Sequence, residues 1–438
     1  MNLVLSAQST AVSNTTPAAQ CGNRRYIFAQ HASSPERPRI SVSSYGRPSD
    51  RRRRRRQNRR RSPYVVPNPS WFQLEDFANH DRLKACSDIV QSHGGKGPGI
   101  DGIRFGELTN AEIYMVLRTL ASGLRNRQYR PRPYRIASIP KPAGGTRDLS
   151  IACEPDKAVA KALQLCLDDY WQLHLPRLRQ SHHDVLRSVA RRIEGGQYFL
   201  TVDDIEKNFD NVRIEDVMRF HREHISQPGL LWLIETCVRG NDCHRQTGLP
   251  QGNAYSPTAN EVVLRPGLDQ RLEAEGRSHA VTERFVDNLI GSTATAHEGM
   301  SLRESWEEYL SDLELNLKGQ DGPTFDVREP NECVVLGTLL RYRDGRVHFT
   351  LPETYFSNLT SRLDECWTDP DPHADMSVVV TGQFNAYSMV FVEQAEKERV
   401  VSRVLDCLIR SAFYGFSYES LMRIADRASD RWRTFYAF

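Results

Sequence analysis

The chain has 438 residues, of which 39% are hydrophobic and 26% are charged, which is enough for roughly two to four domains. It contains no apolar run of the ~18 residues that a membrane span needs, and residues 1–5 are too short for a signal-peptide core. The nine cysteines include no C-x-x-C pair, so we expect reduced thiols in a cytoplasmic protein with no membrane partner.

The net charge of +3 is distributed unevenly along the chain. Residues 1–62 carry 14 arginines against two carboxylates, a net charge of +12, whereas the remainder has 44 basic and 53 acidic residues, a net charge of −9. The composition of this tail predicts disorder. Its arginine run is a candidate clamp for nucleic-acid phosphates, or alternatively a solvated tail or an organelle transit segment. The run consists of Arg51, Arg52, Arg53, Arg54, Arg55, Arg56, Arg59, Arg60 and Arg61.

The apolar periodicities predict helices interrupted by a few strands and hairpins. Asp344-Gly345 is a two-residue hairpin signal, and Ser256 is a candidate N-cap with Pro257 in the first turn. In chain order, the predicted elements are helices over 71–92 and 107–126, strands over 134–139 and 146–151, helices over 155–175 and 184–194, a strand over 197–204, helices over 213–225 and 229–238, a helix opening at Ser256, a strand over 279–287 with a hairpin partner after it, a helix over 302–315, strands over 334–341 and 346–351, and helical stripes near 355–366, 385–393 and 398–412.

Two cations flank the glycine-rich turn of the first hairpin. Lys141 precedes Gly144-Gly145 and Arg147 follows it. Two cations on a flexible hairpin can fold over a triphosphate, and Arg can donate two hydrogen bonds at once to phosphate oxygens. The alternative is an ordinary solvated hairpin.

Asp204 and Asp287 are the candidate metal ligands, because each is expected where an apolar strand ends. Rigid carboxylates that lie side by side repel each other and need a cation. Oxygen ligands of this kind suit Mg²⁺ and two-metal phosphoryl transfer. A single Asp at a strand end is more often a turn or cap residue. Strand alternation predicts that Asp203 points to the opposite face from Asp204, and Asn288 adds a neutral carbonyl beside Asp287.

Residues 248–260 form a second candidate element, rich in Gly, Pro and polar side chains. Gln251 can bond a base or sugar, and the N-terminus of the following helix offers N–H groups to an anion. Phe209, five residues after Asp204, can lie under the sugar of a nucleotide and exclude a 2′-hydroxyl. The alternative for Phe209 is an ordinary core aromatic.

In order, these segments resemble the reverse transcriptases, most closely the bacterial group II intron-type and group II-like enzymes, over roughly residues 71–438. The matching segments are the G-x-D-G block at 97–102, the fingers strands at 129–141 and 144–151, motif A at 204–212, motif B at 248–260, motif C at 285–288, motif D at 315–318, the primer-grip hairpin at 335–339 and a thumb motif at 382–387.

The resemblance implies an α+β right-hand polymerase fold: a basic tail over 1–62, fingers over 63–195, a palm with an antiparallel sheet backed by helices over 196–351, and a helical thumb over 352–438. It implies an RNA-directed DNA polymerase that uses dNTPs, a primer and a structured RNA template; the oligomeric state is left open. Asp204 and Asp287 would hold two Mg²⁺, together with the carbonyl of Ile205 and, weakly, Asn288. The nucleotide contacts would be Lys141, Arg147, Phe209, Gln251 and Lys318.

The chain also departs from the family pattern. Asn288 replaces the second Asp of motif C, which predicts weaker metal binding, tolerance of Mn²⁺, or a slow or silent site. Residues 176–184 lack the usual block before motif A, and no nuclease region follows the thumb. Two alternatives stay open: a non-catalytic, maturase-like RNA-binding factor, and a defence polymerase that acts against phage. Retron enzymes also stay open, whereas Gln251-Gly252 argues against the diversity-generating subgroup.

Overall fold

The computed structural model describes residues 74–92, 97–140, 146–276, 280–319, 324–330, 333–368 and 371–436. The chain divides into residues Met1–Ser62 and Pro63–Phe438, and all described residues belong to the second unit. The arginine run over 51–61 and Lys141 lie outside the described residues. None of the helices in the described part has the length and apolar character required to span a membrane.

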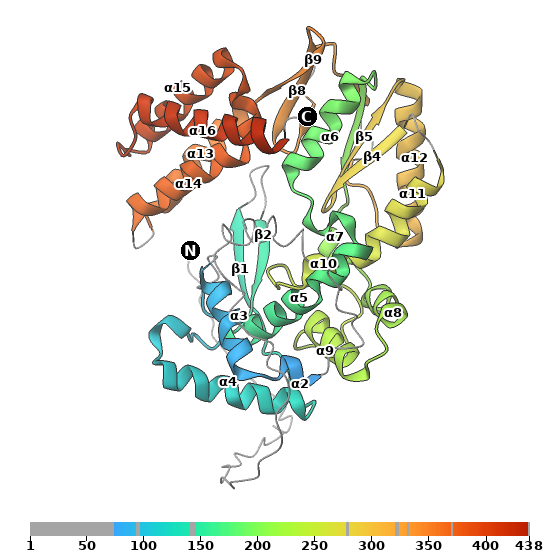
Figure 1. Ribbon diagram of the computed structural model, residues 1–438, viewed down its shortest axis with the longest axis vertical. Helices are drawn as coiled ribbons and strands as arrows, with labels where there is room; N and C mark the ends of the chain where they lie inside the picture. The colour runs from blue at the N-terminus through green and yellow to red at the C-terminus, as the bar shows by residue number, and fades with distance from the viewer. Residues whose placement is uncertain are drawn as a thin grey trace, which may run out of the picture. The chain divides into compact units, whose positions relative to one another are not determined.

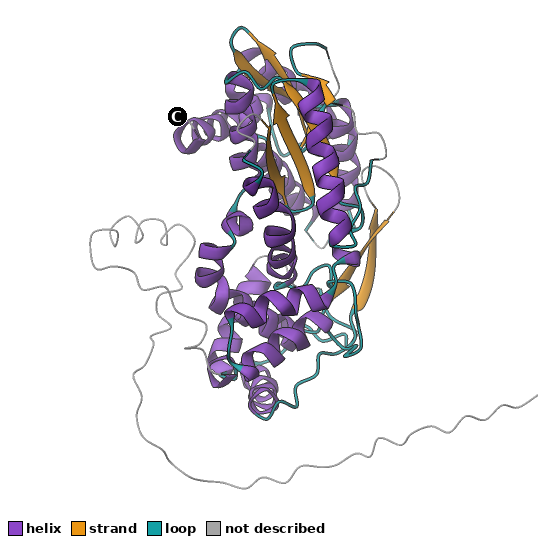
Figure 2. Cartoon of the chain, turned by 90° about the vertical axis from the view of Figure 1, so that its right-hand side faces the viewer, coloured by secondary structure: helices purple, strands orange, loops and turns teal. Residues whose placement is uncertain are grey.

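The unit Pro63–Phe438 mixes helices with antiparallel strands (Figures 1 and 2). Its helices are α2 (Leu74–Phe77), α3 (His80–Ser92), α4 (Asn110–Arg125), α5 (Glu154–His174), α6 (His182–Glu194), α7 (Asn208–Asn211), α8 (Ile214–His224), α9 (Pro228–Arg239), α10 (Ser256–Leu264), α11 (Gln270–Ala274), α12 (Ala296–Asp312), α13 (Glu353–Cys366), α14 (Pro372–Ala386), α15 (Gln394–Arg410) and α16 (Tyr418–Tyr436). Its strands are β1 (Arg135–Pro140), β2 (Thr146–Ile151), β3 (Phe199–Asp204), β4 (Ala280–Phe285), β5 (Asn288–Thr293), β6 (Thr324–Asp326), β7 (Val334–Val335), β8 (Thr338–Arg343) and β9 (Arg346–Thr350).

The central sheet has the order β4-β5-β3-β6, and every neighbouring pair is antiparallel. Its two faces pack against different helices, because consecutive strand residues point to opposite faces. Leu200 and Ile290 join a core cluster with residues of α6, whereas Leu289 joins a second cluster with residues of α12. Gly291 lies on the α12 face, where a Cβ atom would come within 2.7 Å of Leu302. Both faces are therefore covered, and the ends of the strands are held rigidly.

Two further hairpins agree with the sequence prediction. β1 pairs with β2 in the register Arg135 to Ile151. β8 and β9 are joined by Asp344-Gly345, whose φ angles of +51° and +78° match the primed turn that this dipeptide favours. The predicted helical C-terminal part is also confirmed, although its three apolar stripes give no indication of α14 and α16 as separate helices.

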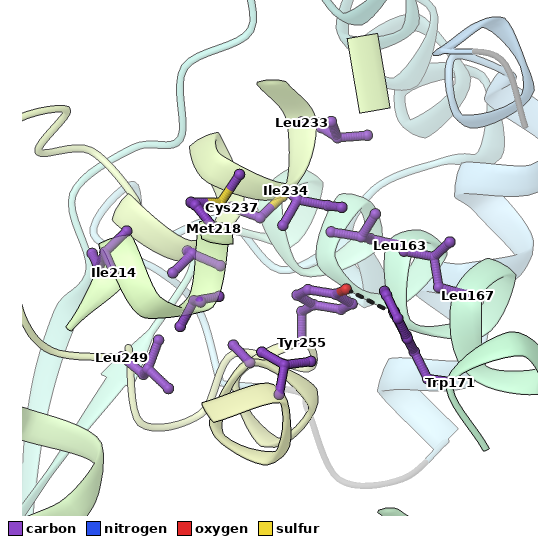
Figure 3. Close-up of a cluster of buried hydrophobic side chains, with 14 of the residues drawn as sticks. Leu163, Leu167, Trp171, Ile214, Met218, Leu233, Ile234, Cys237, Leu249 and Tyr255 are labelled. Carbon is purple, nitrogen blue, oxygen red and sulfur yellow. Dashed lines mark hydrogen bonds between the residues drawn. The ribbon is translucent and has the colours of Figure 1, made fainter. Parts of the chain in front are cut away.

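A buried hydrogen-bonded group of Trp171, His221 and Tyr255 links three segments at the larger core cluster, and Figure 3 shows the contact between Trp171 and Tyr255. The hydroxyl of Tyr255, at the start of α10, accepts a hydrogen bond from Trp171 Nε1 at 3.1 Å and lies 2.8 Å from His221 Nε2. His221 Nδ1 lies 2.7 Å from the carbonyl oxygen of Val217, so this nitrogen carries the proton and Nε2 accepts from Tyr255. Each polar atom of the group thus has a partner in an apolar surrounding.

Three sequence predictions are wrong in detail. Ser256 is the first helical residue and not the N-cap: its hydroxyl donates to the carbonyl of Pro250 at 2.8 Å, which closes the loop before α10. The helix predicted over 302–315 is α12, which begins at Ala296 because Thr295 and Glu298 form a capping box. Asp287 does not end a strand, since β4 stops at Phe285.

Candidate metal and nucleotide site

The two candidate ligands, 83 residues apart in the sequence, meet at one end of the central sheet. Asp204 is the last residue of β3, and Asp287 lies in the two-residue turn between β4 and β5. Because β3 pairs with β5, Asp204 lies directly opposite Asn288. The N–H of Ile205 donates to the carbonyl oxygen of Asp287 at 3.0 Å, which fixes the two segments to each other through the backbone.

Both carboxylates lie in an environment that disfavours their negative charge. Burial raises the pKa of Asp204, and the charge of Asp287 raises it further, although Lys318 at 3.6 Å counteracts both effects. Burial also raises the pKa of Asp287. The groups that counteract this rise are its own backbone N–H, the charge of Arg147, the amide of Asn288 and the charge of Lys318. Burial of the two carboxylates therefore outweighs the effect of the nearby cations on their pKa values.

One oxygen at this site has no hydrogen-bond partner. Oδ1 of Asp204 is buried and accepts no hydrogen bond, although the side chain as a whole is 34% exposed. A buried acceptor without a donor is rare in proteins, and a bound cation is one of its explanations. Two carboxylates with neutral oxygens nearby are the set that Mg²⁺ takes, along with water and substrate phosphates. Within the described ranges, no cluster of three or more His, Cys, Asp or Glu side chains could hold a metal ion by itself. The two carboxylates and the neutral oxygens beside them fit Mg²⁺ when water and substrate phosphates supply the other ligands.

Asp203 points away from this pair, as strand alternation predicts. Its carboxylate accepts from the N–H of Gly319 at 3.0 Å and pairs with Arg303 of α12 at 3.1 Å. Lys318 is the residue before Gly319, and its N–H donates to the carbonyl of Asp204 at 2.8 Å. Asp203 therefore anchors the segment that carries Lys318.

Asn288 donates a hydrogen bond from Nδ2 to Oδ1 of Asp287 at 3.2 Å. The amide thus stabilises the charged form of Asp287, and a second Asp at this position could not do so. Asn288 also adds no charge beside Asp287, where an Asp would add a further carboxylate.

Asn288→Asp should destabilise the metal-free protein by roughly 1 kcal/mol, because it adds a third negative charge beside Asp204 and Asp287. The same charge should increase the stabilisation that Mg²⁺ gives. Thermal melting with and without Mg²⁺ checks both effects. Asn288→Ala is the control, since it removes the hydrogen bond without adding charge. Equal stabilisation of the Asp variant and the wild type by Mg²⁺ would contradict the metal assignment of this position.

Of the described nucleotide candidates, Arg147 and Lys318 interact with the aspartate pair, whereas Gln251 and Phe209 contact neighbouring segments. The exposed Arg147 of β2 is close enough to Asp287 to lower its pKa. Gln251 links two further segments: its carbonyl accepts from the N–H of Ser150 at 2.7 Å, and its Nε2 donates to Oδ1 of Asp210 at 3.1 Å. Phe209 is partly buried against the larger core cluster, which agrees with the core-aromatic alternative as well as with a sugar contact.

Reasoning from the sequence missed Arg284, which is fully buried three residues before Asp287. A signal was present, because Arg284 interrupts an otherwise strand-like run leading to the Asp. A charged residue at such a position is buried only when it is paired.

Comparisons with known proteins show which proteins this chain resembles. Residues 139–320 match the family model described as reverse transcriptase (RNA-dependent DNA polymerase). Protein YkfC of Escherichia coli (strain K12) is 24% identical over 300 residues, which are 63% of this chain and 75% of that protein. The putative COX1/OXI3 intron 1 protein of Saccharomyces cerevisiae is 27% identical over 238 residues, 50% of this chain and 27% of that protein. An uncharacterized 91 kDa protein in a cob intron of Schizosaccharomyces pombe is 24% identical over 206 residues, 44% of this chain and 24% of that protein.

Over residues 139–320, a segment that includes both aspartates, the chain is similar to the reverse transcriptase family. It spans only about a quarter of the length of the two fungal relatives. Both of these relatives are named as intron proteins, which is the kind of relative that the resemblance to intron-type enzymes predicts.

Proposed function

We propose that the protein is an RNA-directed DNA polymerase that extends a primer on an RNA template, with Asp204 and Asp287 as metal ligands. The observation that carries this proposal is the meeting of the two carboxylates at one sheet end, with an unpartnered buried oxygen on Asp204. We assign residues 63–195 to fingers, 196–351 to a palm and 352–438 to a thumb, and we infer a cytoplasmic location.

The residues around the pair have distinct roles in this proposal. Bound Mg²⁺ would lower the pKa of the primer 3′-hydroxyl and neutralise charge on the pyrophosphate leaving group. Asp204 and Asp287 hold the ions, with the Ile205 carbonyl and Asn288 as neutral oxygens. Arg147 and Lys318 are cations for the triphosphate, together with Lys141. Gln251 positions the template or nucleotide through its contact with β2.

Primer extension by the full chain tests this proposal. A DNA primer annealed to an RNA template, with dNTPs and either Mg²⁺ or Mn²⁺, should give products that depend on the metal. Extension on RNA should be lost when the chelator EDTA is added. The absence of any product with either metal, from a folded protein that binds the primed template, would contradict the enzyme assignment.

Phe209→Ala should reduce the preference for dNTPs over NTPs by roughly 10- to 100-fold, because the side chain would no longer fill the space beside the sugar C2′. The measurement is kcat/KM for a dNTP and for the matching NTP. Phe220→Ala is the matched control, since Phe220 is a partly buried aromatic of the same core cluster. An unchanged sugar preference in Phe209→Ala would leave Phe209 as a core residue only.

A second candidate function is a non-catalytic or weakly active RNA-binding factor of the maturase kind. Asn288 favours it, because the turn carries one carboxylate where the family carries two. The names of the fungal relatives, which place them in introns, agree with it. Tight binding of a structured RNA without incorporation under Mg²⁺ or Mn²⁺ would support this candidate over the polymerase.

A further inference from the structure

Arg284 of β4 carries a guanidinium with no exposed surface, two residues before Val286. The group lies between Glu261 of α10 and Asp269 of the π-helical segment that follows α10. It donates to Glu261 at 2.7 and 2.8 Å and to Asp269 at 2.7 and 3.0 Å. One further bond, from Nη1 to the carbonyl oxygen of Val286 at 2.7 Å, reaches the turn that carries Asp287.

The buried group is balanced in charge. Arg177 approaches Asp269 at 3.3 Å and donates to the carbonyl oxygens of Thr282 at 3.1 Å and Arg284 at 3.4 Å. Two arginines thus face two carboxylates, Glu261 and Asp269. For stability alone, apolar side chains of similar volume serve as well as a buried ion network. The network therefore needs another explanation, and its contact with the Val286 carbonyl offers one.

Val286 occupies a backbone conformation that its side chain disfavours. It is the first of the two turn residues between β4 and β5, and its φ is +60°. Primed hairpin turns favour glycine at this position, and a β-branched residue there is strained. Such a conformation persists only where the surroundings hold it. The bond from Arg284 to the Val286 carbonyl is a restraint on the strained residue itself.

We infer that Arg284 is a positioning residue, which holds the strained Val286-Asp287 turn so that the Asp287 carboxylate faces Asp204. This inference rests on the proposed function of the two carboxylates as metal ligands. Only a guanidinium can supply the five donors in a fixed fork that the two carboxylates and the carbonyl require. Lysine keeps the charge but cannot make all of these bonds.

The first test is Arg284→Lys in the full chain, followed by hydrogen–deuterium exchange of the turn and of the Ile205 amide, which donates to Asp287. We expect exchange at these amides to be at least about 10-fold faster than in the wild type. Arg239→Lys is the matched control, because Arg239 also binds a carboxylate, Glu235, and a backbone carbonyl, Arg245, on another element. The control should leave exchange at the turn unchanged.

Val286→Gly separates positioning from general stability. Glycine adopts a positive φ without strain, so it should restore slow exchange at the turn of Arg284→Lys without restoring the melting temperature. The affinity for Mn²⁺, measured by electron paramagnetic resonance, should fall by about 10- to 100-fold in Arg284→Lys and recover in the double variant. If Arg284→Lys fails to fold, Glu261→Gln takes its place, because it weakens the ion pair that holds Arg284. Glu261→Gln should show a smaller loss of Mn²⁺ affinity, and Val286→Gly should reverse this loss.

The inference would be overturned if Arg284→Lys left hydrogen exchange at the turn unchanged. It would also be overturned if Val286→Gly failed to restore slow exchange and Mn²⁺ affinity in the double variant. The exchange readout needs neither metal nor activity. If Asp287→Asn leaves Mn²⁺ binding unchanged while exchange follows the expected pattern, the metal assignment fails and the positioning of the turn by Arg284 stands.

Discussion

Asp204→Asn should reduce nucleotide incorporation by about 10³-fold or more and should also make the protein more stable at pH 7. The loss of activity follows from the removal of a charged metal ligand. The gain in stability follows because burial and Asp287 raise the pKa of Asp204, so that its negative charge destabilises the folded state despite Lys318. Primer extension and chemical denaturation of the same preparations measure the two effects.

The stability gain of Asp204→Asn should depend on pH with a defined sign. A carboxyl whose folded pKa is raised binds more protons in the folded than in the unfolded state between the two pKa values. Its destabilising effect is full above the folded pKa and disappears as the pH falls towards the unfolded value of 3.8. The difference in unfolding free energy between variant and wild type should therefore shrink on acidification. A gain that grows on acidification would contradict this account of Asp204.

Asp216→Asn is the matched control. Asp216 is buried and pairs with Arg213 at 2.6 Å and with Arg219 at 2.9 Å. The same substitution there removes a charge that two arginines compensate and weakens both ion pairs, although Arg213 keeps Glu314 as a partner, so it should destabilise the fold. Opposite signs for the two Asp→Asn variants would show that Asp204 is retained for a purpose other than stability.

Tyr255→Phe should lower the free energy of unfolding by about 2–4 kcal/mol. The substitution leaves the N–H of Trp171 and the Nε2 atom of His221 buried without partners, and each unsatisfied group costs about 1–3 kcal/mol. Tyr309→Phe is the control, because the Tyr309 hydroxyl binds the carboxylate of Glu275 near the surface and should contribute little. A loss in Tyr255→Phe no larger than in this control would contradict the contribution of the Tyr255 hydroxyl, whose bond to Trp171 is drawn in Figure 3.

The same group predicts acid sensitivity. Burial lowers the pKa of His221 to about 4, from an ordinary value of 6.5. Between these values the unfolded state binds the extra proton, so stability falls as the pH falls from 6.5 towards 4. Replacement of His221 by Gln should flatten this part of the stability profile, measured by urea denaturation at a series of pH values. A profile equally steep in the variant would assign the acid sensitivity to other groups.

Much of the fold follows from local patterns in the sequence. The hairpin at Asp344-Gly345 and the helices α5 and α6 lie where turn chemistry and apolar periodicity place them. The short strand β6 does not, because its three residues form a strand only by pairing with β3 across more than 100 residues of sequence. Local patterns carry no information on such pairing.

The candidate site could be predicted only in part, for the same reason. The aspartates are visible as polar ends of apolar runs, and the family resemblance suggests that they meet. Their electrostatic state depends on burial, on Lys318 and on Arg147, which tertiary contacts alone bring close. The role of Arg284 depends on the carboxylates of Glu261 and Asp269, and that of Asp203 on the N–H of Gly319, and local sequence patterns do not place these partners.

The central claim is that Asp204 and Asp287 together hold divalent cations. The most direct measurement is anomalous diffraction from crystals of the full chain soaked with Mn²⁺, compared with crystals of Asp287→Asn. The account predicts anomalous density between the two carboxylates of the wild type, within ligand distance of Oδ1 of Asp204, and its loss in the variant. Ordered crystals that show no density there, or density that persists in Asp287→Asn, would contradict it.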